Sequence, residues 1–116
     1  MHELTVTNTL VQMVLSECQQ KKISHPQNII VDLGLFTSYS KDSLLFYYDI
    51  LKQEIPLLKD TALLIHEIPG KIQCNTCKHR SALKDPYMVL CPLCHSSDVA
   101  IVSGREFMLR EIETAG

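Results

Sequence analysis

The 116-residue sequence has no excess of basic side chains and no long apolar run. Its 11 lysine and arginine residues stand against 13 aspartate and glutamate residues, which gives a formal net charge of −2 at pH 7. Nucleic-acid binding depends on clustered positive charge, so this balance argues against a nucleic-acid partner. No apolar stretch is long enough to span a bilayer, and we expect no membrane association.

The start of the chain also lacks the features of a secretory signal. Residues 1–5 (MHELT) contain neither a basic start nor an apolar stretch. We therefore expect a cytoplasmic protein, in a compartment where thiols stay reduced. No paired carboxylates and no nucleophile constellation stand out, so we expect that the protein is not an enzyme.

What is present is the composition of a small globular protein, with 46% apolar and 21% charged residues. Apolar periodicity predicts a helix over about residues 3–22, and a second one from Ser40, its expected N-cap, to Pro56. Segments rich in β-branched or alternating residues predict strands over 28–36, 61–68 and 105–113. The helix positions that we expect to face the core are Leu4, Val11, Val14, Leu15 and Cys18 in the first helix and Leu44, Leu45, Tyr48, Leu51 and Ile55 in the second.

Residues 71–103 differ in composition from the rest and indicate an inserted module. The module holds two C-x2-C pairs, Cys74 with Cys77 and Cys91 with Cys94, with 13 residues between the pairs. Two residues between cysteines allow one tight turn to direct both sulfurs to a common point. Two such turns supply four thiolates at tetrahedral corners, the arrangement typical of structural zinc. We therefore predict an inserted four-cysteine domain that resembles a zinc ribbon.

Other states of these four sulfurs stay open at this stage. Close pairs in a reducing compartment argue against disulfides, and two facing pairs argue for a metal over a redox motif. Iron could occupy the same four thiolates, although zinc is the usual metal of a closed four-sulfur site. His79 and His95 flank the pairs and are possible alternate metal ligands. The simpler interpretation is that both are surface histidines.

A second group of donor atoms lies at the start of the chain. The α-amine of Met1, the following amide nitrogen and the His2 imidazole form a compact set, to which Glu3 can add a carboxylate. Nitrogen donors in a plane suit Ni(II) or Cu(II). Taken alone, however, these residues are explained as well by a frayed terminus without a role.

The whole pattern is more specific than either part. A Met1-His2-Glu3-Leu4 start on a helix, followed late in the chain by Cys74-x2-Cys77 and Cys91-Pro92-x-Cys94, resembles the HypA/HybF family of hydrogenase nickel-maturation proteins. The resemblance covers essentially the whole chain. Its further segments are Leu33-Gly34-Leu35, Ser43-Leu44-Leu45-Phe46-Tyr47-Tyr48, and Ser103-Gly104-Arg105-Glu106 with Ile112-Glu113.

The resemblance implies a nickel metallochaperone of the α+β class, with two helices packed on a small, about three-stranded sheet. It implies a nickel-binding domain of residues 1–70 and 104–116 and an inserted zinc-binding domain of residues 71–103. In such a protein His2 binds Ni(II) as transient cargo, supported by the Met1 amine and Glu3, and the four-cysteine zinc is structural. The implied partners are a HypB-type GTPase, the large subunit of [NiFe]-hydrogenase and, in some members, urease maturation factors.

One feature of this chain departs from the family pattern. Many members carry glycine after each C-x2-C pair, where this chain has Lys78 and His95, which leaves the geometry of the two turns open.

A rival function remains, that of a zinc-ribbon module that binds nucleic acid or protein, because Lys78, His79, Arg80 and Lys84 cluster near the first pair. The acidic balance of the chain favours a solvated loop instead.

Overall fold

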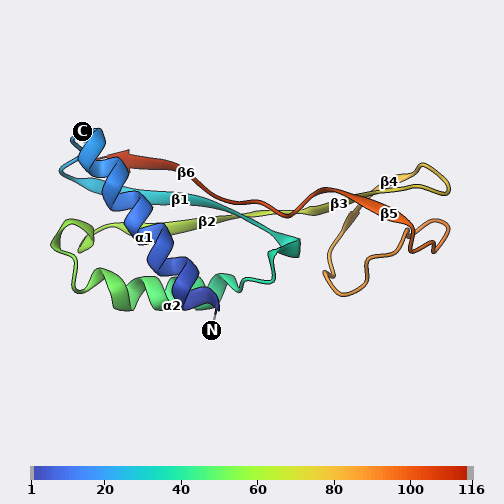
Figure 1. Ribbon diagram of the computed structural model, residues 1–116, viewed down its shortest axis with the longest axis horizontal. Coiled ribbons are helices and arrows are strands. Elements are labelled where there is room, and N and C mark those ends of the chain that lie inside the picture. The colour runs from blue at the N-terminus through green and yellow to red at the C-terminus, as the bar shows by residue number, and fades with distance from the viewer. Residues whose placement is uncertain (1, 115–116) are drawn as a thin grey trace. The chain divides into compact units, whose positions relative to one another are not determined.

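The computed structural model describes residues 2–114, and side chains from Glu3 onward. These residues form two α-helices, two 3-10 turns and six strands. In chain order the elements are α1 (His2–Gln20), β1 (Pro26–Gly34), η1 (Leu35–Thr37), α2 (Lys41–Lys52), η2 (Pro56–Leu58), β2 (Ala62–Ile68), β3 (Gly70–Cys74), β4 (Arg80–Leu83), β5 (Val99–Ser103) and β6 (Phe107–Thr114) (Figure 1).

The strands form two three-stranded sheets, one in the order β2-β1-β6 and one in the order β4-β3-β5. The chain divides into two compact units. The described residues of 1–31, 39–66 and 108–116 form the first unit, and residues 32–38 and 67–107 form the second. The predicted α+β class, with two helices and a small sheet, is confirmed. None of the described helices is both long and apolar enough to cross a membrane.

Helix α1 buries one stripe of its surface in the first unit. Val11, Val14 and Cys18 are almost fully buried, at the three- and four-residue spacing that places side chains on one helix face. They share the core with Ile29 and Val31 of β1. Three of the predicted face positions are therefore confirmed as core. The expectation for Leu4 was wrong, because this side chain in the first turn is 45% exposed.

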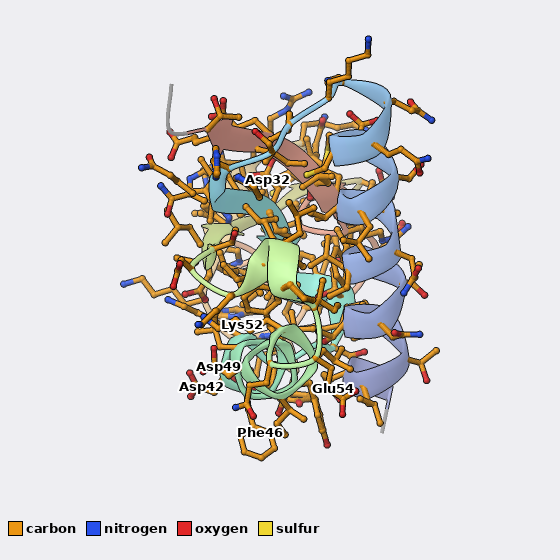
Figure 2. All side chains as sticks on the ribbon, turned by 90° about the vertical axis from the view of Figure 1, so that its left-hand side faces the viewer. Asp32, Asp42, Phe46, Asp49, Lys52 and Glu54 are labelled. Atoms are coloured by element: carbon orange, nitrogen blue, oxygen red, sulfur yellow. The ribbon has the colours of Figure 1, made fainter. Side chains whose placement is uncertain are left out.

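Helix α2 begins where the sequence predicts. The Oγ of Ser40 accepts a hydrogen bond from the Ser43 amide at 3.3 Å, which satisfies one of the free amides of the first turn. Near the other end, Lys52 lies 4.0 Å from the Asp49 carboxylate (Figure 2), and it lies 5.6 Å from the centre of the Tyr48 ring. The helix ends at Lys52, earlier than expected, because Pro56 is preceded by extended backbone at Ile55 and starts a 3-10 turn.

Tyr48 anchors α2 to the core of the first unit. Its side chain is 1% exposed, and its hydroxyl donates a 2.8 Å hydrogen bond to the carbonyl of Thr61. Thr61 is buried too, and its Oγ1 donates to the Pro26 carbonyl at 2.7 Å. Burial raises the pKa of Tyr48 well above its usual range. This chain of hydrogen bonds links α2, the start of β2 and the start of β1.

Strand β1 ends at Gly34, two residues earlier than predicted, because the 3-10 turn η1 begins at Leu35, and the backbone there also meets another segment. The Gly34 amide donates to the Glu106 carbonyl, and the Phe36 amide donates to the Gly104 carbonyl, both at 2.7 Å. A Cβ on Gly34 would lie 2.1 Å from the Gly104 carbonyl oxygen, so no larger side chain fits. Gly104 has φ +112°, a conformation that favours glycine. Two segments that carry the family resemblance thus touch backbone to backbone.

The sheet of the second unit is centred on β3. Its Ile72 is fully buried and lies opposite Ser81 of β4 and Ile101 of β5. Strand β3 ends at Cys74, which lies opposite Val99. Because β3 leads directly into the first cysteine pair and β5 follows the second, the sheet brings the two pairs to the same end of the unit.

We predict that Tyr48→Phe lowers the free energy of unfolding by about 1–2 kcal/mol, because it leaves the buried Thr61 carbonyl without its donor. Urea denaturation followed by circular dichroism measures this change. Tyr47→Phe is the matched control, since it removes the same hydroxyl from a half-buried neighbour. Equal stability of the Tyr48 variant and the wild-type protein would contradict the anchoring role.

Candidate metal centre

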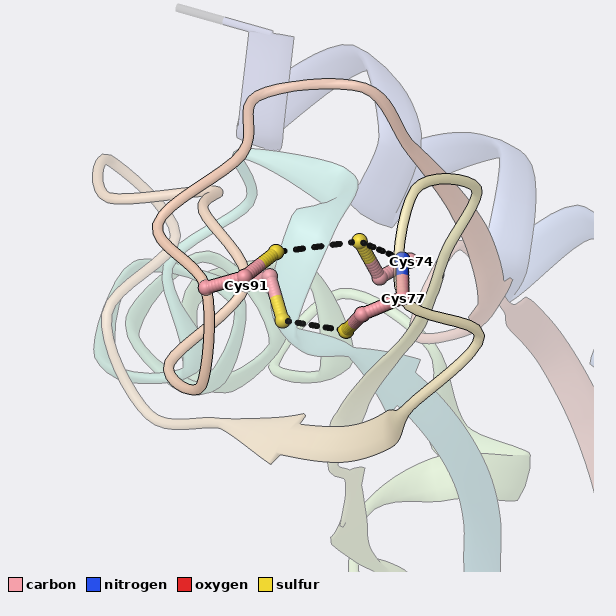
Figure 3. A group of neighbouring side chains, drawn as sticks. Cys74, Cys77 and Cys91 are labelled. Atoms are coloured by element: carbon pink, nitrogen blue, oxygen red, sulfur yellow. Dashed lines mark hydrogen bonds between the residues drawn. The ribbon is translucent and has the colours of Figure 1, made fainter.

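The structure brings the four cysteines of the two predicted pairs together. Their sulfur atoms all lie within 4.8 Å of one another. The Sγ atoms of Cys74 and Cys94 are 3.5 Å apart, and those of Cys77 and Cys91 are 3.6 Å apart (Figure 3). All four are free thiols. The closest sulfurs therefore belong to different pairs, which means that the two turns face each other as predicted.

Backbone hydrogen bonds hold each turn in shape. In the first turn the amides of Thr76 and Cys77 donate to the Cys74 sulfur at 3.3 and 3.4 Å, and the Lys78 amide donates to the Cys74 carbonyl at 3.0 Å. In the second turn the His95 amide donates to the Cys91 carbonyl at 2.8 Å. The same closing bond in both turns shows that the two C-x2-C segments fold alike.

Both turns close with a residue in the left-handed region. Lys78 has φ 66° and His95 has φ 64°, each one residue after its C-x2-C pair. These are the two positions where the family resemblance led us to expect glycine. The sequence left the geometry of the two turns open, and the structure shows that both adopt the left-handed conformation without glycine. A non-glycine residue in this conformation costs about 1–2 kcal/mol.

Side chains and amides also tie the two turns to each other. The Thr76 and Ser96 hydroxyls are 3.1 Å apart, and the Asn75 side-chain amide donates to the Asp98 carboxylate at 3.0 Å. The Asn75 backbone amide donates to the Asp98 carbonyl at 2.9 Å. These contacts fix the two pairs relative to each other through polar groups of the loops.

The four thiols differ in pKa. Hydrogen bonds from backbone amides, with that of Cys77 the strongest, lower the pKa of Cys74 to about 6. The amide of Cys94 lowers the pKa of Cys91 in the same way. Amides of His79 and Ser96 act to lower the pKa values of Cys77 and Cys94, but burial and the neighbouring sulfurs outweigh them. The pKa of Cys77 is raised, and that of Cys94 is raised to about 12.

These observations fit a divalent metal ion. Sulfurs bound to tetrahedral zinc at about 2.3 Å are about 3.8 Å apart, close to the 3.5 and 3.6 Å separations in the cluster. Crowded thiols cannot all ionise alone, whereas a dication bound among them would stabilise four thiolates and release protons. The donor set thus has the size and the chemistry of a closed four-thiolate site.

The flanking histidines are not part of the sulfur cluster. Among the described residues, the group of potential ligands at this site comprises the four cysteines only. His79 and His95 are both exposed, and the His79 carbonyl accepts the Cys74 amide at 2.8 Å. Their exchange with a cysteine ligand stays a prediction.

The predicted donors at the start of the chain are described in part. Met1 and the side chain of His2 lie outside the described residues, and the backbone of His2 begins α1. The Glu3 carboxylate accepts a hydrogen bond from the Ser40 amide at 3.1 Å, at the N-cap of α2. Hydrogen bonds from its own amide and from that of Ser40 lower the pKa of Glu3. Glu3 therefore connects the start of α1 to the start of α2.

Three contacts of these residues are not predicted by the sequence. Neither the Glu3–Ser40 contact nor the Thr76–Ser96 and Asn75–Asp98 contacts were expected, because each joins residues far apart in the sequence. Only the Glu3–Ser40 contact had a signal in the sequence. Ser40 is the predicted N-cap of the second helix, and a carboxylate is favourable near the N-terminus of a helix.

A family model described as "Hydrogenase/urease nickel incorporation, metallochaperone, hypA" matches residues 1–114. Similar proteins include a "Hydrogenase maturation factor HypA" from Moorella thermoacetica, 34% identical over 109 residues and covering 94% of this chain and 95% of that protein. A protein of the same name from a Nostoc species is 31% identical, covering 97% and 95%. Both share nearly the full length of this chain.

Two solved structures share the fold. One is the solution structure of the Ni metallochaperone HypA from Helicobacter pylori, with a TM-score of 0.66 and 21% identity, covering 97% of this chain and 96% of that one. The other is a solution structure of a HypA protein, with a TM-score of 0.69 and 23% identity, covering 98% and 96%. The resemblance inferred from the motifs is confirmed.

We predict that the purified chain binds Zn(II) in a 1:1 ratio and that Cys91→Ser weakens this binding by about tenfold or more, because one of four thiolates is lost. Competition with a coloured zinc chelator measures the affinity. Cys18→Ala is the matched control, since Cys18 is buried in α1 and lies outside the cluster. Unchanged binding in Cys91→Ser, or equal loss in both variants, would contradict the site.

We predict that Lys78→Gly stabilises the zinc-loaded second unit by about 1 kcal/mol, because glycine adopts the left-handed conformation without strain. Thermal unfolding of the zinc-loaded protein tests this. Lys84→Gly removes the same charge at a residue outside the left-handed region and should not stabilise. A Lys78→Gly variant that is no more stable than the wild-type protein would contradict this prediction.

Proposed function

Since the chain belongs to the HypA family of nickel-incorporation metallochaperones, we propose that it carries Ni(II) as transient cargo and delivers it during maturation of [NiFe]-hydrogenase. The observation that carries this proposal is the family match over residues 1–114, which includes both the Met1-His2-Glu3 start and the four cysteines. Relatives that cover nearly the full length are named maturation factors, which supports a delivery role without catalysis.

In this proposal Cys74, Cys77, Cys91 and Cys94 hold Zn(II). Zinc would cross-link the two turns and stabilise the fold around them, and its four protein ligands would leave no open position for chemistry. The support is the clustering of the four sulfurs within 4.8 Å. We assign the zinc domain to residues 71–103 and the nickel domain to residues 1–70 and 104–116.

Nickel binds at the start of α1 in this proposal. The ligands are the His2 imidazole, the Met1 amine and the amide nitrogen between them, because nitrogen donors in a plane suit Ni(II). Glu3 supports the site. Its carboxylate accepts from the Ser40 amide, so Glu3 fixes the backbone next to His2. A few donors at a chain end can bind and release a metal more readily than a closed cage.

Delivery requires protein partners. We propose a HypB-type GTPase and the hydrogenase large subunit, with urease maturation factors as further candidates, and a cytoplasmic site of action. The family description names both hydrogenase and urease nickel incorporation, which supports both targets. The side-chain charges support protein partners over nucleic acid, because the chain carries a net charge of −2.

We predict that untagged, zinc-loaded protein binds about one Ni(II) per chain by calorimetry and that His2→Ala weakens this binding by about tenfold or more, because the imidazole is lost. His25→Ala is the matched control, as it removes an exposed histidine just before β1. A glycine placed before Met1 should also weaken binding, since it moves the α-amine away.

Nickel binding that survives in His2→Ala would contradict the terminal site. Loss of binding in His25→Ala to the same extent would also contradict it. If the wild-type protein bound no Ni(II) in the presence of zinc, the delivery function itself would be wrong.

A further inference from the structure

Helix α2 carries an exposed face that the nickel and zinc sites do not use. Phe46 is 60% exposed and Ile50 is 49% exposed, four residues apart and therefore on the same side of the helix. Figure 2 shows Phe46 pointing away from the rest of the first unit. The opposite side of α2 is occupied by the buried Leu44 and Tyr48. The helix thus carries large apolar side chains on both sides, although only one side packs against its own core.

The exposed ring of Phe46 contacts a neighbouring ring. The ring centres of Phe46 and Tyr47 are 5.4 Å apart, with the planes inclined by 70°, an edge-to-face arrangement that aromatic pairs prefer. Tyr47 is half-buried, so it joins Phe46 to the packed part of the helix. A ring contact that restricts the Phe46 side chain before binding reduces the conformational entropy that is lost when a partner covers it.

Carboxylates border this apolar pair. Asp42 and Asp49 lie one turn before and one turn after Phe46 on the same face, and both are exposed (Figure 2). Lys52 lies 4.0 Å from the Asp49 carboxylate and 5.6 Å from the centre of the Tyr48 ring, and its side chain is 26% exposed against 70% for that of Asp49. The exposed face is therefore an aromatic and aliphatic centre bordered by two carboxylates, of which Asp49 is paired with the less exposed Lys52.

This face begins beside the proposed nickel site. The amide of Ser40, the N-cap of α2, donates to the Glu3 carboxylate at 3.1 Å, and Glu3 directly follows His2 in the chain. Asp42 lies in the first turn of α2, and Phe46 follows one turn later. A protein that covered Phe46 would therefore bind α2 one to two helical turns away from Ser40, the residue that contacts Glu3 at the start of α1.

We propose that the exposed face of α2, formed by Asp42, Phe46, Asp49 and Ile50, docks the GTPase partner of the proposed function while nickel is exchanged. The complementary surface is an apolar pocket that receives Phe46, bordered by lysine and arginine side chains that face the two aspartates. Central aromatic anchors dominate binding at interfaces, and bordering charges mainly speed association and set its salt dependence. This inference rests on the proposed function, because it names the surface that brings the partner to the cargo.

The test uses the purified HypB-type GTPase of the same organism as the probe and the full-length, zinc-loaded chain. Calorimetry should show Phe46→Ala binding the GTPase about tenfold or more weakly than wild type. Leu64→Ala, a truncation of another exposed apolar side chain in the first unit, should bind like wild type. Asp42→Lys with Asp49→Lys should weaken binding more at low salt than at high salt, while Asp60→Lys should not.

Nuclear magnetic resonance locates the contact directly. Amide shifts of the isotope-labelled chain on addition of the GTPase should be largest over residues 40–53. Shifts that centre instead on the exposed Tyr87 and Met88 of the second unit would overturn the proposal, and so would unchanged affinity of Phe46→Ala. If sedimentation showed that wild type self-associates and Phe46→Ala does not, the face would be a contact between two copies, which also overturns it.

Nickel titration separates this inference from the function on which it rests. Phe46→Ala should bind Ni(II) like wild type, because Phe46 supplies no metal donor, whereas His2→Ala should keep its affinity for the GTPase. Failure of wild type to bind the GTPase, with normal nickel binding, would overturn the docking proposal and leave the nickel site intact. Normal GTPase binding through α2 without nickel binding would leave the docking surface but refute delivery.

Discussion

The second unit is organised around four sulfur atoms that must meet at one point. Among its described residues the buried apolar side chains are few, with Leu33 and Ile72 the main aliphatic ones. Strand β3 delivers Cys74 to the cluster, and polar contacts between the loops align the second pair with the first. Small protein modules with little core need a cross-link to stay folded, and the proposed zinc ion would supply one here. The left-handed backbone at Lys78 and His95 costs free energy, and we infer that bringing the four sulfurs together outweighs this cost.

The first unit is stabilised in the ordinary way, by packing. Helices α1 and α2 bury apolar stripes, and the Tyr48–Thr61–Pro26 hydrogen bonds connect α2 to the sheet. The start of α1 is tied to α2 by the exposed contact between Glu3 and Ser40. The proposed zinc site, closed by four thiolates, and the proposed nickel site at the start of α1 would therefore have opposite physical characters. That difference matches the proposed roles, in which one metal stays and the other is handed on.

Local patterns in the sequence predicted most elements correctly. The N-cap at Ser40, the core positions Val11 and Val14, and the α+β class with a small sheet are confirmed by the structure. Element ends were less well predicted. Strand β1 stops at Gly34, where a 3-10 turn begins, and Gly34 lies against the backbone of Gly104; no periodicity signals a contact between residues so far apart in the chain. Leu4 belongs to the apolar pattern of α1, yet its position in the first turn leaves it exposed.

The sequence by itself determined the donor chemistry, since the spacing of Cys74, Cys77, Cys91 and Cys94 already specifies two tight turns with four thiols. It also determined the family, because the motifs extend over the whole chain. Only the tertiary structure decided which sulfurs lie next to each other, that Glu3 reaches Ser40, and that Phe46 faces outward while Tyr48 faces the core. The physical reason is that spacing and periodicity act between near neighbours in the chain, whereas burial and side-chain contacts depend on which distant segments pack together.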